Sequence, residues 1–275
     1  ESKDYWSASW QPVGKPLDKY KSICRHGTAY SIFETEYEGI KSEAKYFVPL
    51  GQTFEYWRLK VTNTGSKARK LRAFTYCEFS NQWNTTQDQV NLQYSIFICK
   101  GEKAKENMLR YSIHENLYLQ HQKNPAIGDY MSEWMALVGQ PMTGYDTDRQ
   151  SFIGTYGSYK EPDSVINGEC KNSNAYGDNI CGSMQSDIEL APGETKELVV
   201  LLGIGDANVE GEKAVKEFGS IAKCDEEFDK LVKAWHAKLG SLNVKTPDED
   251  INHTVNVWGL YNCLITFAWS RAASL

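Results

Sequence analysis

The sequence predicts a mainly β protein, in which a large antiparallel β-sandwich is followed by a helical linker and the opening helix of an α-helical domain. Three observations support this prediction. Apolar residues recur with a period of two from Thr28 to about Gly203, which is the spacing of half-buried strands. No helical spacers separate these strands, so a parallel sheet is disfavoured. After Gly205 the apolar spacing changes to that of amphipathic helices.

Residues 54–62 show the strand pattern most clearly. Here Trp57, Leu59 and Val61 alternate with charged or polar residues, and turn residues follow at 63–65. The same alternation is present in residues 71–79, 92–99, 108–114, 134–138, 184–190 and 197–204. Because these segments follow one another closely, an antiparallel sandwich is the simplest arrangement.

Two helices are predicted after the strands. The first carries one apolar stripe and ends near Gly240; the stripe consists of Phe228, Leu231, Val232, Trp235 and Leu239. The second begins at Thr246-Pro-Asp-Glu249, which has the form of a capping box with Thr246 as the N-cap. The sequence therefore divides into a β-sandwich domain at 1–205, a helical linker at 206–245 and the start of an α-helical domain at 246–275.

The second helix becomes more apolar toward its end, where it carries Trp258, Tyr261, Phe267 and Trp269. A helix that is apolar on most faces belongs inside a larger core. We therefore expect the chain to be the front part of a bigger protein, truncated within its helical domain.

Composition excludes several classes of partner. The chain has 275 residues, a net charge of −6 and a pI near 5.5. This balance argues against a surface for nucleic acid or for an anionic membrane. No apolar run of about 18 residues is present, so no membrane span is expected. With 41% hydrophobic and 12% aromatic residues, the chain can build a sizeable core.

The cysteines and histidines suggest no metal site. The seven cysteines include no CxxC pair, and none of the five histidines is spaced from another His or Cys as metal ligands are. An odd number of scattered cysteines fits no disulfide framework. We therefore expect reduced thiols, no bound metal and a cytoplasmic location.

Residues 142–183 form a long, polar, glycine-rich stretch that is predicted to be a surface loop. The carboxylates in and around its first half are Asp146, Asp148, Glu161 and Asp163. Catalysis by a glycosidase requires two facing carboxyl groups, but proximity in the chain does not place them across a substrate. They are interpreted as solvated carboxylates and turn formers. The sequence alone therefore shows no evident catalytic residue.

Residues 79–94 have a different composition. Trp83 lies among asparagines and glutamines, including Asn84, Asn91 and Gln93. An aromatic face suits the apolar side of a pyranose, and neutral amides both donate to and accept from hydroxyl groups. A sugar-binding segment and a connecting loop with a buried Trp are equally compatible with this composition.

Several motifs, taken in order, resemble those of one family. They are residues 5–13 (YWSASWQPV), 24–27 (CRHG), 46–50 (YFVPL), 61–65 (VTNTG), 83–84 (WN), 91–93 (NLQ), 146–149 (DTDR), 152–154 (FIG), 190–194 (LAPGE) and 270–274 (SRAAS). This ordered set resembles the N-terminal portion of glycoside hydrolase family 94 phosphorylases, which are cellobiose phosphorylase-like. The resemblance covers essentially the whole chain.

The resemblance implies an architecture and an activity. It implies a β-sandwich, a helical linker, an (α/α)6 barrel that holds the active site, and a C-terminal jelly roll, usually in a homodimer. Such enzymes cleave a β-glucosidic bond with inorganic phosphate and invert the anomeric carbon to give α-glucose 1-phosphate. They need no cofactor, and phosphate is a substrate. The catalytic Asp would lie in the barrel, outside this chain.

The resemblance also implies roles for residues of this chain. Arg271 matches an Arg that binds the attacking phosphate. The segment with Trp83, Asn84, Asn91 and Gln93 matches one that reaches the acceptor subsite of the neighbouring subunit. Tyr94 stands where cellobiose phosphorylases have Arg, so strict cellobiose specificity is not implied.

The function expected from these roles is that of an inverting phosphorylase of cellobiose or a related β-linked gluco-oligosaccharide. One alternative is a non-catalytic carbohydrate-binding or dimerisation module. Another is a relative that acts as a hydrolase.

Overall fold

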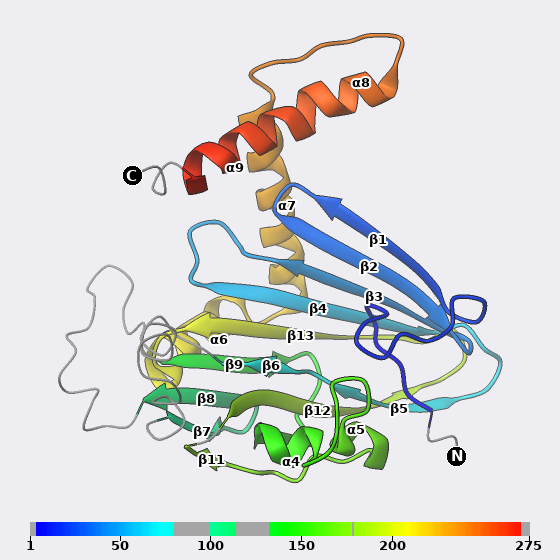
Figure 1. Cartoon of the computed structure of the whole chain (residues 1–275), viewed down its shortest axis with the longest axis vertical. Helices are drawn as coiled ribbons and strands as arrows, with labels where there is room; N and C mark the ends of the chain where they lie inside the picture. Colours follow the sequence, from blue (N-terminus) through cyan, green and yellow to red (C-terminus); the bar gives the residue numbers. More distant parts are fainter. Residues whose placement is uncertain (1–3, 80–98, 114–131, 178, 271–275) are drawn as a thin grey trace.

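The computed structural model describes residues 4–79, 99–113, 132–177 and 179–270, and Figure 1 shows two sheets with helices around them. The strands are β1 (Lys21–Gly27), β2 (Tyr30–Tyr37), β3 (Ile40–Phe47), β4 (Phe54–Asn63), β5 (Arg69–Phe74), β6 (Cys77–Glu78), β7 (Cys99–Lys105), β8 (Met108–Ile113), β9 (Glu133–Val138), β10 (Gly144–Asp148), β11 (Ala175–Tyr176), β12 (Ile180–Leu190) and β13 (Thr195–Ile204). The helical segments are α4 (Arg149–Ile153), α5 (Asp163–Asn167), η1 (Ala207–Gly211), α6 (Glu212–Phe218), α7 (Ile221–Leu239), α8 (Glu249–His253), η2 (Thr254–Gly259) and α9 (Leu260–Ser270).

The strands form two antiparallel sheets. The larger sheet has the order β1-β2-β3-β4-β13-β9-β8-β7-β11, and the smaller one has the order β10-β12-β5, with β6 also paired to β12. The prediction of a mainly β protein with large antiparallel sheets is confirmed. Sequence periodicity could not give the strand order, because β13 inserts between β4 and β9, which are distant from it in the chain.

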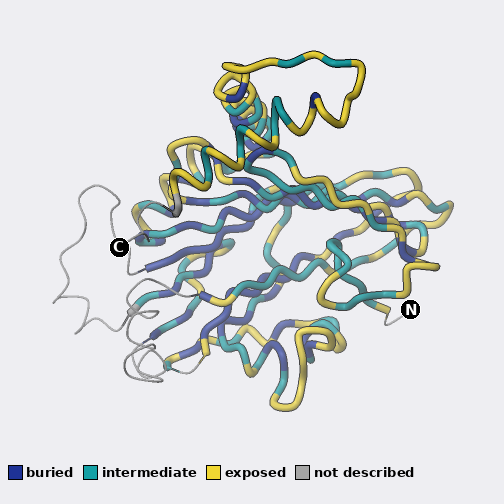
Figure 2. Tube along the Cα trace, turned by 45° about the horizontal axis from the view of Figure 1, so that its top comes forward, coloured by how far each residue is buried: buried dark blue, intermediate teal, exposed yellow. Residues whose placement is uncertain are grey.

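The main core lies between the two sheets. Leu198 and Val200 of β13 face the smaller sheet and pack in one cluster with Met184 and Ile188 of β12. Successive side chains of a strand point to opposite faces, so the residue between Leu198 and Val200 points to the outer face. Figure 2 shows the resulting band of buried residues along the middle strands.

Helices α6 and α7 cover the outer face of the larger sheet. Cys224 and Leu231 of α7 pack with Val199, Leu201 and Trp134 of the sheet. Helix α7 ends at Leu239 and is followed by Gly240, so the predicted amphipathic helix and its end are confirmed. Among the described residues, no helix combines the length and the hydropathy that a membrane span needs.

An ion-pair network joins α7 to the sheet. Arg58 of β4 is almost buried; its Nε donates to Oε2 of Glu197 at 2.8 Å, and its Nη1 pairs with Asp225 of α7. The Tyr56 hydroxyl donates to the carbonyl of Phe218 at 2.8 Å. These contacts fix α7 against the central strands.

Replacing Arg58 with methionine is expected to lower the free energy of unfolding by about 3 kcal/mol, because the change leaves a largely buried carboxylate without its partner. The matched control is Arg72→Met at the exposed pair with Asp187, for which a cost below about 1 kcal/mol is expected. Chemical denaturation of the full-length protein measures both. Equal costs for the two variants would show that the network does not hold the helix.

The predicted cap of the second helix is wrong by two residues. Asp248 is the N-cap of α8, and its carboxylate accepts from the backbone N–H groups of Asp250 and Ile251. Thr246 instead donates its hydroxyl to the carbonyl of Asp248. An Asp can cap a helix as well as a Thr and adds a negative charge at the positive end of the helix dipole. The helical segments α8, η2 and α9 then follow one another without a break.

The last helical segments rest on α7. Tyr261 of α9 contacts Trp235 of α7, with ring centroids 5.1 Å apart. Several apolar side chains of this region remain exposed, including Ile251 at 48%, Trp258 at 38% and Phe267 at 59%. The assignment of α9 to an (α/α)6 barrel stays a prediction.

All seven cysteines lie in the described part of the chain, and none forms a disulfide. Burial is the main cause that raises the pKa of Cys77, Cys170, Cys181 and Cys224. These four thiols therefore stay protonated at neutral pH. The redox state of the seven cysteines stays a prediction.

Candidate functional site

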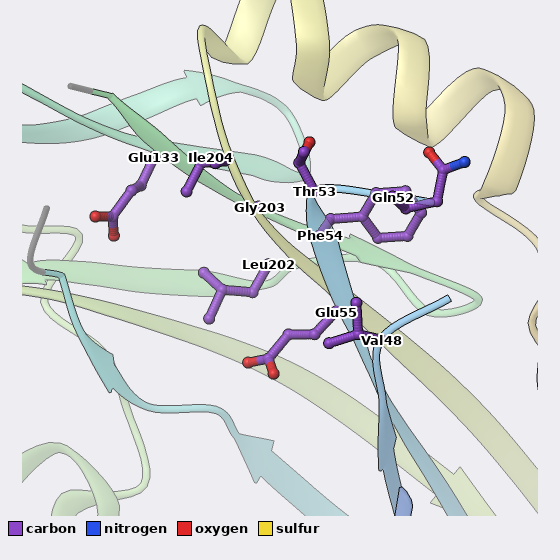
Figure 3. A pocket seen from close by; sticks show the side chains of 9 residues that line it. All are labelled: Val48, Gln52, Thr53, Phe54, Glu55, Glu133, Leu202, Gly203 and Ile204. Carbon is purple, nitrogen blue, oxygen red and sulfur yellow. The ribbon is translucent and has the colours of Figure 1, made fainter. Parts of the chain in front are cut away.

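A hollow of about 360 Å³ opens at the edge of the sandwich where β4 and β9 begin and β13 ends (Figure 3). It is lined by Val48, Gln52, Thr53, Phe54, Glu55, Glu133, Leu202, Gly203 and Ile204. The strand register explains this grouping, because Glu55 lies opposite Leu202, and Glu133 lies opposite Ile204. Glu55, Leu202 and Glu133 therefore share the face of the larger sheet that looks toward the smaller sheet.

Two carboxylates lie at this hollow. Glu55 accepts a hydrogen bond from Nε1 of Trp57 at 2.8 Å, and Glu133 is 9% exposed. Cys77 of β6 lies nearby on the opposing sheet. Burial raises the pKa of the Cys77 thiol, and the negative charges of Glu133 and Glu55 raise it further. The hollow thus combines two carboxylate acceptors, Glu55 and Glu133, with apolar lining residues such as Leu202.

A row of rings crosses β1 to β4 next to the hollow. The ring centroids of His26 and Phe33 are 6.3 Å apart, those of Phe33 and Tyr46 are 5.9 Å apart, and those of Tyr46 and Trp57 are 6.1 Å apart. All four side chains are at least partly exposed. Aromatic rings with hydrogen-bonding groups beside them can pack against the apolar face of a sugar.

Sequence reasoning missed this row. The periodicity from Thr28 onward indicated strands but not their pairing. The pairing places Tyr46 opposite Trp57 and Phe33 diagonally across from Tyr46 on the same face of the sheet. The signal that could have found the row is one aromatic residue on the same face of each of three consecutive strands.

A second cluster surrounds Glu78, the last residue of β6. Its Oε1 accepts from Nε of Arg149 at 2.8 Å and from the hydroxyls of Tyr76 at 2.7 Å and Tyr159 at 2.5 Å. Burial raises the pKa of Glu78, but these hydrogen bonds outweigh it and hold the pKa below its ordinary value. Glu78 is therefore ionised at neutral pH and held by three donors.

The predicted site residues lie outside the described residues. These are Trp83, Asn84, Asn91, Gln93, Tyr94 and Arg271. The structure therefore does not test their roles, which stay predictions. The described residues next to them in the chain are Phe79 and Cys99 on either side of 80–98, and Ser270 before Arg271.

Residues 142–183 are not a surface loop, and that prediction is wrong. The stretch contains β10, α4, α5, β11 and the start of β12. Asp146 is fully buried, and its carboxylate accepts from the backbone N–H groups of Lys171 and Ser173 and from the hydroxyls of Ser164 and Ser173. A carboxylate with this many donors organises a loop rather than facing water.

Asp148 has a different role from Asp146. Its carboxylate accepts from the backbone N–H groups of Gln150 and Ser151 and so caps α4. The interpretation of Asp146 as a solvated carboxylate is therefore corrected, whereas Asp148 forms a local turn contact as expected. The signal in the sequence was the spacing of Asp148 before a short apolar segment, which is typical of an N-cap.

The geometry defines a large antiparallel β-sandwich domain with helix α7 on the outer face of its larger sheet. Comparison with known families agrees with this class. Residues 1–221 match the supersandwich domain of glycosyl hydrolase 94, and residues 234–275 match the catalytic domain of the glycosyl hydrolase 94 superfamily. The chain belongs to the glycosyl hydrolase 94 family, as its motifs predicted.

Several curated relatives are named as phosphorylases. The chain is 31% identical to the N,N'-diacetylchitobiose phosphorylase of Vibrio furnissii and 33% identical to that of Vibrio proteolyticus, over 274 residues in each case; both matches cover 100% of this chain and 32% of the relative. It is 26% identical to the solabiose phosphorylase of Paenibacillus borealis, with 99% of this chain and 34% of that protein covered. The chain thus spans about a third of the length of these phosphorylases.

Proposed function

We propose that the full-length protein is an inverting phosphorylase that cleaves cellobiose or a related β-linked gluco-oligosaccharide with inorganic phosphate, giving α-glucose 1-phosphate. The observation that carries this proposal is the order of the two family matches, a supersandwich domain followed by the start of a catalytic domain. The described part of the chain is then scaffold and linker, and the catalytic Asp belongs to a later segment. The apolar side chains exposed on η2 and α9 would pack against that segment.

The donor sugar has a second candidate. Two relatives with 31% and 33% identity are named as phosphorylases of N,N'-diacetylchitobiose. Others are named for solabiose, for 3-O-β-D-glucopyranosyl-β-D-glucuronide and for cellobionic acid. An N-acetylglucosaminyl donor is therefore the alternative to a glucosyl donor in the same reaction.

Inorganic phosphate is a substrate, and no cofactor takes part. The protein is a homodimer in which the segment with Trp83 and Tyr94 serves the acceptor subsite of the neighbouring subunit. We place it in the cytoplasm, which the seven cysteines without a disulfide support.

The test uses the synthetic direction of the full-length enzyme. α-Glucose 1-phosphate and α-N-acetylglucosamine 1-phosphate are each offered with glucose, cellobiose, glucuronic acid and N-acetylglucosamine, and released phosphate is measured. The proposal predicts release with α-glucose 1-phosphate and a gluco-configured acceptor. Release with the N-acetylated donor alone would favour the second candidate. No release with any pair would contradict a phosphorylase and favour a carbohydrate-binding module.

A further inference from the structure

The motif at residues 24–27 places a thiol beside an imidazole. Cys24 and His26 both belong to β1, and side chains two positions apart in a strand point to the same face. Sγ of Cys24 lies 3.2 Å from Nε2 of His26. The two groups are within hydrogen-bonding distance, so the imidazole can take up the proton of the thiol.

The neighbouring strand β2 fixes the orientation of this imidazole. Ser31 lies opposite His26 in the strand register, and its Oγ lies 2.8 Å from Nδ1 of His26. When Nδ1 carries the proton and donates it to the hydroxyl, Nε2 is an acceptor that faces the thiol. The ring of Phe33, which lies opposite Cys24, packs edge-on against the imidazole at an interplanar angle of 88°. Ser31 and Phe33 thus limit rotation of His26 away from Cys24.

The thiol of Cys24 is accessible to solvent. Cys24 and His26 are exposed on β1, which is the first strand in the order of the larger sheet (Figure 1). The nearby ion pair of Arg25 with Glu34 alternates in sequence with Cys24 and Phe33, so it points to the opposite face of the sheet. A small molecule can therefore reach the thiol without displacing an ion pair.

Cys24 differs from the other cysteines of the chain. Burial is the main cause that raises the pKa of four thiols, those of Cys77, Cys170, Cys181 and Cys224. Cys99 is buried as well. Cys263 is exposed, but α9, which carries it, contains no histidine. Cys24 combines exposure with an adjacent proton acceptor.

A thiol paired with an imidazole is suited to exchange with disulfides. The thiolate is the nucleophile, and an isolated thiol is only a few per cent thiolate at neutral pH. Once His26 has taken the proton, Sγ of Cys24 attacks one sulfur of a disulfide. The disulfide bond breaks, a new S–S bond to Cys24 forms, and the leaving thiolate takes the proton from His26 and departs as a thiol. The attacking disulfide is itself the oxidant in this step.

We propose that Cys24 is a reactive thiol that forms a reversible mixed disulfide with small organic disulfides, with His26 as the proton acceptor and Ser31 as the group that orients it. An excess of a small thiol reverses the modification by the same exchange. The reactivity of Cys24 does not depend on the proposed phosphorylase activity, because the test measures the thiol itself.

The experiment follows mixed-disulfide formation in the full-length protein at neutral pH with 2-hydroxyethyl disulfide, an uncharged probe. Peptide mass spectrometry separates Cys24 from the other cysteines. We expect Cys24 to react about tenfold faster in the folded protein than in urea, because the larger thiolate fraction outweighs the lower nucleophilicity that accompanies it. His26→Gln removes the proton acceptor and is expected to abolish this difference. Ser31→Ala is expected to lower the rate by less.

The matched control is Arg25→Gln, which changes the residue between Cys24 and His26 but on the opposite face of β1. Loss of an exposed ion pair has little effect on structure, so the control is expected to stay within about twofold of the wild type. Rates in urea should be the same for all variants. A Cys24 rate in the folded wild type no higher than in urea would overturn the proposal. Equal rates for the wild type and His26→Gln, or an equal loss in His26→Gln and Arg25→Gln, would also overturn it.

Discussion

Replacing Asp146 with alanine is expected to lower the free energy of unfolding of the β-sandwich domain by about 4 kcal/mol. The fully buried carboxylate is the acceptor for two backbone N–H groups and two serine hydroxyls. Each buried donor that loses its acceptor costs about 1–3 kcal/mol, and local rearrangement recovers part of the sum. For a domain of this size the loss corresponds to a decrease in Tm of roughly 10 °C.

The matched control is Asp148→Ala, two residues away. Asp148 caps the short helix α4, and loss of an N-cap costs about 1 kcal/mol. Scanning calorimetry of the full-length protein measures Tm, and hydrogen exchange measures the local effect. Asp146→Ala is expected to accelerate exchange of the backbone amides of Lys171 and Ser173. If both variants cost the same and exchange at these amides is unchanged, the buried carboxylate does not organise residues 142–183.

Replacing Arg271 with alanine is expected to raise the KM for phosphate about 100-fold in the full-length enzyme. A charge-assisted contact between a guanidinium and phosphate is worth about 1.5–3 kcal/mol, and each 1.4 kcal/mol is a factor of ten. The affinity for the disaccharide is expected to change by no more than about threefold, because the residue is proposed to touch the nucleophile only.

Arg271→Lys separates charge from geometry. Lysine keeps the positive charge but cannot make two parallel hydrogen bonds to one phosphate, so an intermediate KM is expected. Initial rates of phosphorolysis at varied phosphate and fixed disaccharide give these values. A phosphate KM equal to that of the wild type in Arg271→Ala would remove this residue from the phosphate site.

Much of the fold could be predicted because its signals are local. The alternation of Trp57, Leu59 and Val61 reports one buried face of β4, and the stripe with Phe228 and Leu231 reports the buried side of α7. The end of α7 at Gly240 follows from a residue that readily terminates helices. These features depend on residues that are only a few positions apart in the chain, so they can be recognised from a single sequence.

What could not be predicted depends on contacts between distant residues. The hydrogen-bond donors of Asp146 come from residues 164–173. The Asp146 carboxylate is buried only because this later segment folds back over it. The partner of Arg149 is Glu78, 71 residues away. The cap of α8 was misplaced because Thr246 and Asp248 both have capping side chains, and only the backbone geometry selects Asp248.

The residues predicted for the candidate site and the residues that the structure describes there are two different sets. Trp83, Asn84, Asn91, Gln93, Tyr94 and Arg271 came from composition and motif resemblance and lie outside the described residues. The structure instead describes other features: the cluster at Glu78, the contacts of Phe79 and Cys99 with Tyr111, and the hollow at Glu55 and Glu133. These features could not be recognised in the sequence, because each depends on how the strands pair.

The dependence of disaccharide cleavage on phosphate tests the proposed phosphorylase activity most directly. The full-length protein is incubated with cellobiose, and separately with N,N'-diacetylchitobiose, with and without inorganic phosphate, and the products are followed by proton and phosphorus NMR. We expect cleavage of cellobiose only when phosphate is present, with one α-glucose 1-phosphate formed for each bond broken. Cleavage to free sugars without phosphate, or no cleavage of either disaccharide, would contradict it.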